Sequence, residues 1–234
     1  MVIPNYLERA FEPNFKVSQE YDFQTEENDA ATTELSTLVF TVKNLGRLKI
    51  KQGRIIACDP FDGYDDVSIK PIKADFPKGK YLCEVSIACI DESAEEYVGF
   101  ARIRFSNEIP VRWELAVREG ENIEKYVDND DFGYPVSSGT GGFMDISAQK
   151  DYKTHVKKNE NYWEEIEDEM AERDEKACGS IIWAMEDTNM AVFPSGYGDG
   201  TYPSYIGYDE YGKICRLVTD FLVIDSGAAL IEAF

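Results

Sequence analysis

Three aspartates beside glycine-rich segments are the residues of this 234-residue chain best suited to chemistry. Asp59 follows an apolar run, Asp145 ends a first glycine-rich segment (Ser137–Asp145), and Asp199 lies inside a second (Phe193–Tyr202). Each segment places a Ser-Gly step before its Asp. If the three carboxylates converged, they could bind Mg²⁺ or Ca²⁺, which take oxygen ligands. They could also form an acid/base pair, because one carboxylate raises the pKa of another nearby.

The same residues also fit a purely structural role. A turn Asp commonly accepts hydrogen bonds from nearby backbone N–H groups, and Gly follows where φ is positive. One shared site explains two such loops more simply than two separate strained turns. We therefore expect residues 137–145 and 195–202 to lie against one another or against Asp59, forming one concave site. The candidate ligand-binding residues are Asp59, Ser138, Gly139, Asp145, Ser195, Gly196, Asp199 and Tyr202, with Asp145 and Asp199 as candidate metal ligands.

Familiar catalytic motifs are missing from the sequence. His155 is the single histidine, so a Ser-His-Asp or Cys-His mechanism would depend on it alone. Neither Ser138 nor Ser195 has a plausible base nearby, and no Cys/His spacing suits zinc. Neither glycine-rich segment ends in Gly-Lys-Ser/Thr, so neither is a phosphate-binding P-loop. We expect no cofactor.

The charge balance is the strongest bulk property, with 45 acidic side chains, 24 basic ones and a formal net charge of −21. A field of this sign repels nucleic-acid phosphates and anionic membranes, so neither is an expected partner. It speeds encounter with basic proteins, and the expected partner is a basic protein. The charge could also serve only to keep the protein soluble.

The cysteines favour a reducing compartment. The chain has five, an odd number, without a Cys-x-x-Cys motif, and Cys83 and Cys89 alternate with other residues as small core side chains do. We expect all five thiols to be free. The N-terminus lacks a signal-peptide pattern, and no run approaches the roughly 18 apolar residues of a membrane span. The expected location is the cytoplasm.

Alternation of apolar and polar residues, the pattern of half-buried strands, dominates the chain. The segments that show it, or that form compact apolar runs, are 35–42, 47–51, 53–58, 81–90, 99–105, 111–117, 180–185, 190–193, 202–208 and 214–224. They predict a mainly β protein of the α+β class, with antiparallel sheets and a sandwich-like core.

One segment, 148–176, has the periodicity of a long amphipathic helix. Its apolar stripe contains Trp163, Ile166, Met170 and Ala177, and its other face is strongly acidic. No linker divides the chain, so we expect a single domain over 1–234. Its expected parts are an N-terminal helix and loop (1–34), a first β block (35–120), and the glycine loops, long helix and second β block (132–234).

Several short motifs occur in a characteristic order. They are Gly53-Arg54-Ile55-Ile56-Ala57-Cys58-Asp59-Pro60, Pro77-x-Gly79-x-Tyr81, Arg112-Trp113-Glu114-x-Ala116, Ser138 to Asp145, Ser195 to Gly200, and Asp220-Phe221. In this order they resemble an uncharacterised, largely bacterial family, domain of unknown function 4241. The resemblance covers about residues 46 to 224 and supports Asp59, Asp145 and Asp199 as family features, but it implies no activity.

Two functions fit these observations. The first is a cytoplasmic acidic binding protein without catalysis, in its sharpest form an immunity-type protein that neutralises a basic toxin. The alternative is a carboxylate-based hydrolase, or a module that binds a ligand or divalent cation, built on Asp59, Asp145 and Asp199. The separation of the three carboxylates distinguishes them, because one ion or small ligand must reach all three.

Overall fold

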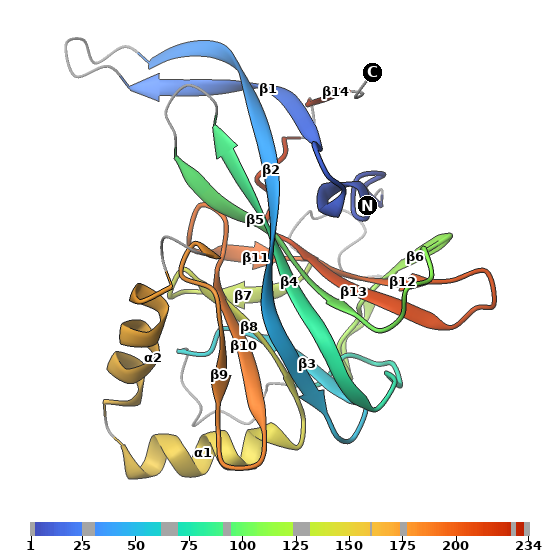
Figure 1. The fold of residues 1–234 in the computed structure, drawn as a ribbon, viewed down its shortest axis with the longest axis vertical. Helices are drawn as coiled ribbons and strands as arrows, with labels where there is room; N and C mark the ends of the chain where they lie inside the picture. Colours follow the sequence, from blue (N-terminus) through green and yellow to red (C-terminus); the bar gives the residue numbers. More distant parts are fainter. Residues whose placement is uncertain are drawn as a thin grey trace.

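The computed structural model describes residues 3–24, 31–61, 70–90, 95–123, 132–159, 161–173, 177–225 and 228–231, and it describes only the backbone of 21–24 and 31–34. A large sheet curls into half a barrel, and a smaller sheet lies beside it (Figure 1). Every strand pair among the described residues is antiparallel, which confirms the mainly β, antiparallel prediction.

The large sheet has the strand order β14-β1-β2-β4-β5-β13-β12-β6, and the small one β3-β8-β10-β9. The strands of the large sheet are β1 (Lys16–Gln24), β2 (Ala31–Ile50), β4 (Gly79–Ile90), β5 (Glu96–Arg104), β6 (Arg112–Leu115), β12 (Ser204–Tyr208), β13 (Ile214–Asp220) and β14 (Ala229–Ile231). Those of the small sheet are β3 (Ile55–Cys58), β8 (Thr140–Asp145), β9 (Ile181–Ala184) and β10 (Asn189–Pro194). A two-stranded ribbon pairs β7 (Tyr134–Val136) with β11 (Gly200–Tyr202).

Strand β2 is one long strand where the sequence predicts two. A β-bulge shifts its register against β4 just before Gly46, which has a φ of 128°. A Cβ at Gly46 would lie 3.3 Å from Ile182 of β9, so the glycine lets β2 pass close to the small sheet. Asn189 of β10 completes this junction, since its side chain accepts from the Lys49 N–H (2.8 Å) and donates to the Arg47 carbonyl (2.9 Å).

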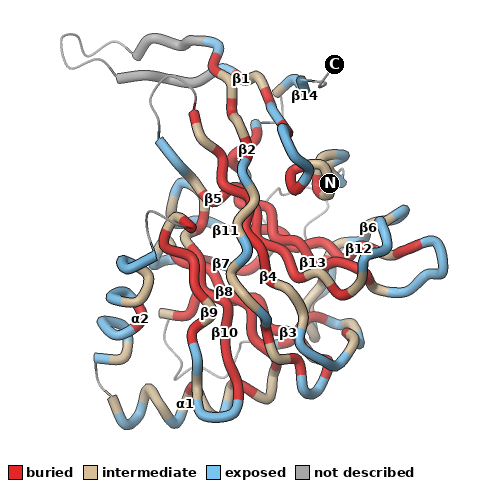
Figure 2. The backbone as a smooth tube through the Cα atoms, viewed as in Figure 1, coloured by how far each residue is buried: buried red, intermediate tan, exposed pale blue. Residues whose placement is uncertain are grey.

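Buried residues run through both sheets (Figure 2), and the apolar ones form two clusters. The larger cluster joins the two sheets and contains Phe143 of β8 and Phe193 of β10, whose ring centroids are 5.1 Å apart. The smaller lies on the opposite face of the small sheet, where the helices cover Trp183 of β9. No helix among the described residues is long and apolar enough to cross a membrane. All five cysteines lie among the described residues, and none of them forms a disulfide, in agreement with the sequence prediction.

The prediction of one long helix is wrong. Two short helices, α1 (Ala148–Lys158) and α2 (Tyr162–Ala171), replace it. Asn159 ends α1 with an extended backbone, and its side chain accepts a hydrogen bond from the Asn161 N–H at 3.1 Å. Asn side chains compete for backbone groups in this way, which is why they favour helix ends.

The helix break at Asn159 changes which side of α2 faces the core. The predicted apolar stripe is therefore also wrong in part. Ile166 is fully buried, but Trp163 is 43% exposed. Tyr162 takes its place toward the core, with its ring 5.8 Å from that of Tyr152.

The prediction of an N-terminal helix and loop over 1–34 is corrected in the same way. The described residues of this stretch form a 3₁₀ turn (Arg9–Phe11) and then β1, while residues 1–2 and residues 25–30 of the expected loop lie outside the described residues. The sequence of β1 does not alternate clearly between apolar and polar residues, because part of the buried face of this strand is polar. Gln19 donates to the Val223 carbonyl and accepts from the Asp225 N–H, both at 3.0 Å.

Residues 3–15, here named the N-terminal strap, cover the face of the large sheet that points away from the small sheet (Figure 1). The rings of Tyr6 and Phe11 pack edge-on against Phe100 of β5, at 5.7 and 6.3 Å. The hydroxyl of Ser86 on β4 donates to the Ala10 carbonyl.

Asp220 is a fully buried carboxylate beneath the strap. It accepts hydrogen bonds from the Tyr6 hydroxyl (3.2 Å) and the Leu222 N–H (2.9 Å). Burial raises its pKa to about 7, well above the value of ~3.9 of an unfolded chain. The folded state therefore retains the proton, and the stability that this contributes at acidic pH is lost as the pH rises from about 4 to about 7.

We expect Asp220→Asn to abolish this loss. In urea unfolding at pH 5 and pH 8, the wild type should lose about 2.5 kcal/mol more than the variant between the two conditions, because about two pH units of the shift lie in this window. Asp225→Asn, which alters an exposed neighbouring carboxylate, is the control and should follow the wild type. Parallel pH dependence of Asp220→Asn and wild type would show that Asp220 does not titrate in this range.

Candidate functional site

The two glycine-rich segments lie against each other, as the sequence predicts. The Ser195 N–H donates to the Gly139 carbonyl at 3.0 Å. A Cβ at Gly139, where φ is 68°, would lie 3.7 Å from the Gly198 Cα. The paired strands β7 and β11 continue this contact along the chain. The glycines therefore allow a close approach of two backbones.

The second segment is held mostly by its own backbone. The Ser195 hydroxyl donates to the Gly198 carbonyl at 2.8 Å, and the Tyr202 hydroxyl lies 2.7 Å from the same oxygen. The Gly196 N–H donates to Val98 of β5 at 3.2 Å, and a Cβ at Gly196 would come within 2.7 Å of a backbone oxygen that follows β13. Ser195 is fully buried and already bonded, so it is not presented as a nucleophile.

Asp59 fastens the end of β3 to the first segment. One carboxylate oxygen accepts from the N–H groups of Ser137 and Ser138, both at 2.9 Å. The other accepts from the Phe61 N–H (2.8 Å) and the Ser138 hydroxyl (2.7 Å). Asp59 is buried, so these bonds give it a structural role.

Asp145 fastens the end of β8 to the turn between β2 and β3. One of its oxygens accepts from three consecutive N–H groups, those of Gln52 (3.1 Å), Gly53 (3.0 Å) and Arg54 (3.3 Å). The other accepts from the N–H of Ser147 at 3.0 Å and from its hydroxyl. The carboxylate is fully buried, and its lone pairs are occupied by the chain itself.

The three aspartates do not converge. Asp59 binds the residues before β8, and Asp145 ends β8, so the strand length separates them by about 17 Å. Asp199 is exposed on the second segment. Within the described part of the chain, no group of three or more His, Cys, Asp or Glu side chains could hold a metal ion.

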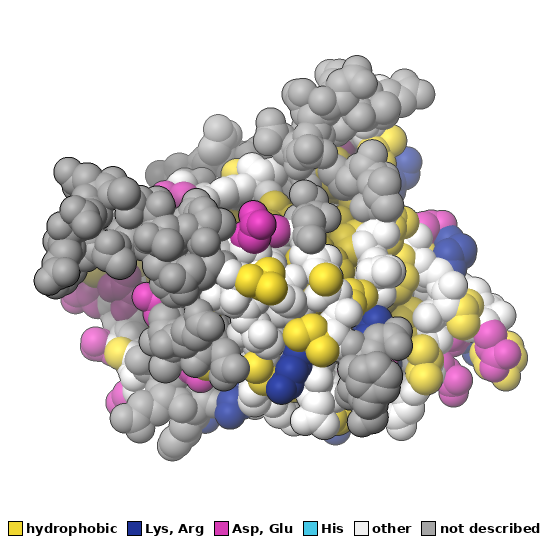
Figure 3. All heavy atoms as spheres, turned by 90° about the horizontal axis from the view of Figure 1, so that it is seen from above, with side chains coloured by type: hydrophobic (Ala, Val, Ile, Leu, Met, Phe, Trp, Pro, Cys, Tyr) yellow, Lys and Arg dark blue, Asp and Glu magenta, His cyan; other side chains and the backbone are white. Residues whose placement is uncertain are grey.

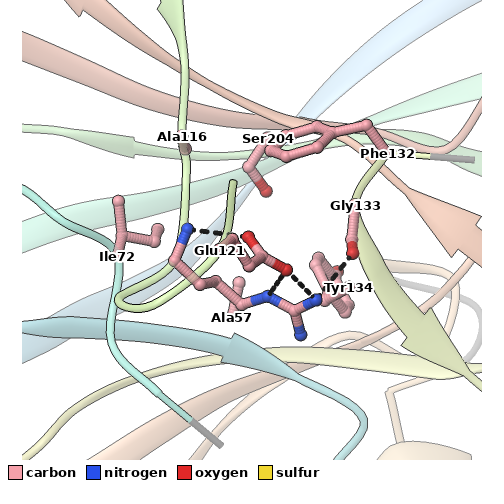
Figure 4. Close-up of a pocket in the computed structure, with 9 residues that line it drawn as sticks. Ala57, Ile72, Ala116, Glu121, Phe132, Gly133, Tyr134 and Ser204 are labelled. Atoms are coloured by element: carbon pink, nitrogen blue, oxygen red, sulfur yellow. Dashed lines mark hydrogen bonds and ion pairs between the residues drawn. The ribbon is translucent and has the colours of Figure 1, made fainter. Parts of the chain in front are cut away.

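The sequence did not point to a small cavity that lies beside the glycine-rich region (Figure 4). Glu121 fills its centre, where it accepts from the Arg118 Nε at 2.7 Å, and Arg118 also donates to the Gly133 carbonyl at 3.1 Å. The volume is about 10 Å³, the room of one water molecule, so this cavity does not hold a substrate.

A larger groove of about 380 Å³ shares Glu121 with this cavity. It lies where β12 and β6 extend beyond the small sheet, and Leu115 and Ile206 give it apolar lining. Its charged residues are of both signs, since Lys73 faces it as well as Glu114. A third hollow lies along α1 and is lined by Lys150, Lys153 and Lys157. None of these three sites, all lined by described residues, includes a residue of 137–145 or 195–202.

The structural role of Asp145 gives a direct test. We expect Asp145→Asn to destabilise the fold by roughly 3 kcal/mol, because one amide cannot replace a carboxylate that accepts several N–H groups. Exposed Asp199→Asn is the matched control and should change stability by less than about 0.5 kcal/mol. Urea unfolding measures both, and equal stability of the two variants would refute the assignment.

Comparison with known proteins agrees with the motifs of the chain. The model of a family described as "Protein of unknown function (DUF4241)" matches residues 48–219, which include both glycine-rich segments, Asp59 and Asp145. No curated protein matches the chain, and no solved structure does. The match covers well over half of the 234 residues, and the chain therefore belongs to the DUF4241 family of proteins of unknown function.

Proposed function

We propose that this chain is a cytoplasmic binding protein without catalysis, and that its partner is a basic protein. In its sharpest form the proposal is an immunity-type protein that neutralises a basic toxin. The observation that carries it is the exposed acidic face of α2, in a chain whose net charge is −21. Electrostatic attraction would speed capture of such a partner.

The aspartates of the glycine-rich segments give the alternative function little support. A hydrolase or cation-binding module needs carboxylate oxygens that a ligand can reach. The carboxylate oxygens of Asp59 and Asp145 instead accept hydrogen bonds from backbone N–H groups, and of the three aspartates only Asp199 is exposed. A hydrolase built on all three has no common place for its substrate.

Helix α2 has the composition of a docking surface. All its charged side chains are acidic, and Glu164, Glu167 and Asp168 are exposed. Trp163 stands among them with 43% of its surface exposed. A tryptophan ring stacks well on Lys or Arg side chains, and Trp is enriched among the residues that dominate binding energy.

The same helix is poorly stabilised by its own charges. Glu164 and Asp168, like Glu165 and Glu169, are one turn apart, where like charges repel. Burial raises the pKa of Glu169, the Arg173 guanidinium opposes this shift, and the carboxylates of Glu172 and Glu165 add to it. Cations from a partner would relieve this repulsion. A local conflict of this kind is common where a sequence serves binding more than stability.

The test uses a neutralised helix. The variant Glu164→Gln, Glu167→Gln, Asp168→Asn removes three negative charges from α2. The control variant Glu12→Gln, Glu108→Gln, Glu210→Gln removes three exposed charges elsewhere. Proteins retained from an extract of the source cells are identified for each, and the affinity of a retained basic protein is then measured at low and high salt.

We expect wild type and control to bind the basic protein, and the α2 variant to bind about tenfold more weakly with a smaller salt dependence. Removing these charges relieves repulsion within the helix, so urea unfolding should show the α2 variant to be about as stable as the wild type. For the immunity-type form, production of the wild type should relieve growth inhibition by the captured protein, and the α2 variant should relieve it less. Equal binding by all three proteins would rule out α2 as the docking surface.

A further inference from the structure

Two buried arginines meet under the N-terminal strap. Arg216 of β13 is 3% exposed and Arg102 of β5 is 6% exposed. Both hold the carboxylate of Glu8 on the strap. The Nε and an Nη of Arg216 donate to its two oxygens at 3.1 and 2.9 Å, and Arg102 approaches it at 3.4 Å. Two parallel N–H···O bonds to one carboxylate are the strongest geometry that Arg offers.

The arginines are positioned without help from Glu8. Arg216 donates through its remaining Nη to the carbonyls of Ser106 and Cys215, both at 2.9 Å. Arg102 donates through Nε to Glu84 of β4 at 2.8 Å. A guanidinium fork that is already held in place loses little entropy when an anion binds to it.

Two buried guanidinium groups need a second carboxylate beside them, in addition to Glu84, to balance their positive charge. The carboxylate of Glu84 balances the positive charge of Arg102. The charge of Arg216 is balanced by Glu8, whose carboxylate it holds through Nε and one Nη. Burial lowers the pKa of Arg102, and the carboxylates of Glu84 and Glu8 oppose that shift. Without Glu8, the sheet would carry an uncompensated buried cation, which is strongly unfavourable.

We propose that Arg102 and Arg216 form a carboxylate-binding site of the sheet, and that Glu8 is its built-in occupant. The site takes a carboxylate from outside the chain when the side chain of residue 8 no longer fills it. Arg102, Arg216 and Glu84 all lie within the family match at 48–219, whereas Glu8 lies before it. This inference does not depend on the binding function proposed above.

Glu8→Ala tests the proposal, because it removes the carboxylate and leaves its space open. We expect the thermal midpoint of the full-length variant to fall by about 10 °C. Sodium formate should then raise it with saturation, by about 3 °C more than sodium chloride of equal ionic strength once formate is about tenfold above its Kd. Formate offers the planar oxygen pair that a guanidinium fork matches, and chloride does not.

Two further variants separate this effect from a general one. Glu8→Gln loses the same charge but still fills the space, so formate and chloride should act on it alike. Glu12→Ala, an exposed change in the same strap, should behave as the wild type does. If Glu8→Ala does not fold, recovery of folded protein in formate but not in chloride supports the site. An equal response of Glu8→Ala to formate and chloride, or no recovery in either, overturns it.

Discussion

The two sheets of this protein depend on a turn that one buried carboxylate holds. Asp145 accepts three consecutive N–H groups from Gln52–Arg54, the short connection by which the chain leaves β2 and enters β3. Because β2 belongs to the large sheet and β3 to the small one, this turn is where the chain passes from one sheet to the other. The bulge at Gly46 and the side chain of Asn189 secure the same junction from the side of β2 and β10. Asp59 repeats the device at the other end of β8, so both ends of this strand are fastened by carboxylates to neighbouring backbone.

The sequence predicts those features that are carried by local patterns. Strands such as β4 and β5 are predicted because apolar and polar residues alternate along each of them. The contact between the glycine-rich segments is also predicted, since glycine clusters indicate close backbone approach. Strand β1 is missed because Gln19 takes an apolar position on its buried face, and the helix break is missed because Asn159 acts through a side-chain bond. The role of Asp145 is beyond local reasoning, because its partners lie more than 90 positions earlier in the chain.

The two buried arginines of the large sheet each have a carboxylate partner. Arg102 and Arg216 are matched by Glu84 and Glu8, and Arg216 donates hydrogen bonds through all three of its guanidinium nitrogens. The negative excess of the chain comes from other positions, some of them buried, such as Asp59 and Asp145, and α2 carries a dense exposed part of it. On the face seen from above, the described residues are largely hydrophobic or uncharged, and both acidic and basic side chains are scattered among them (Figure 3). A chain can thus be strongly acidic overall and still keep a cationic site under its strap.

Strand β2 extends well before the residues that the family model matches. The family match begins at residue 48, near the end of a strand that runs from Ala31 to Ile50. A chain cut to the matched residues would lose most of this strand, leaving the long edge of β4 without its neighbour. It would also lose the strap, and with it the carboxylate that neutralises Arg216. The segment matched by the family model therefore lacks two elements that pack against it in this protein, most of β2 and the strap.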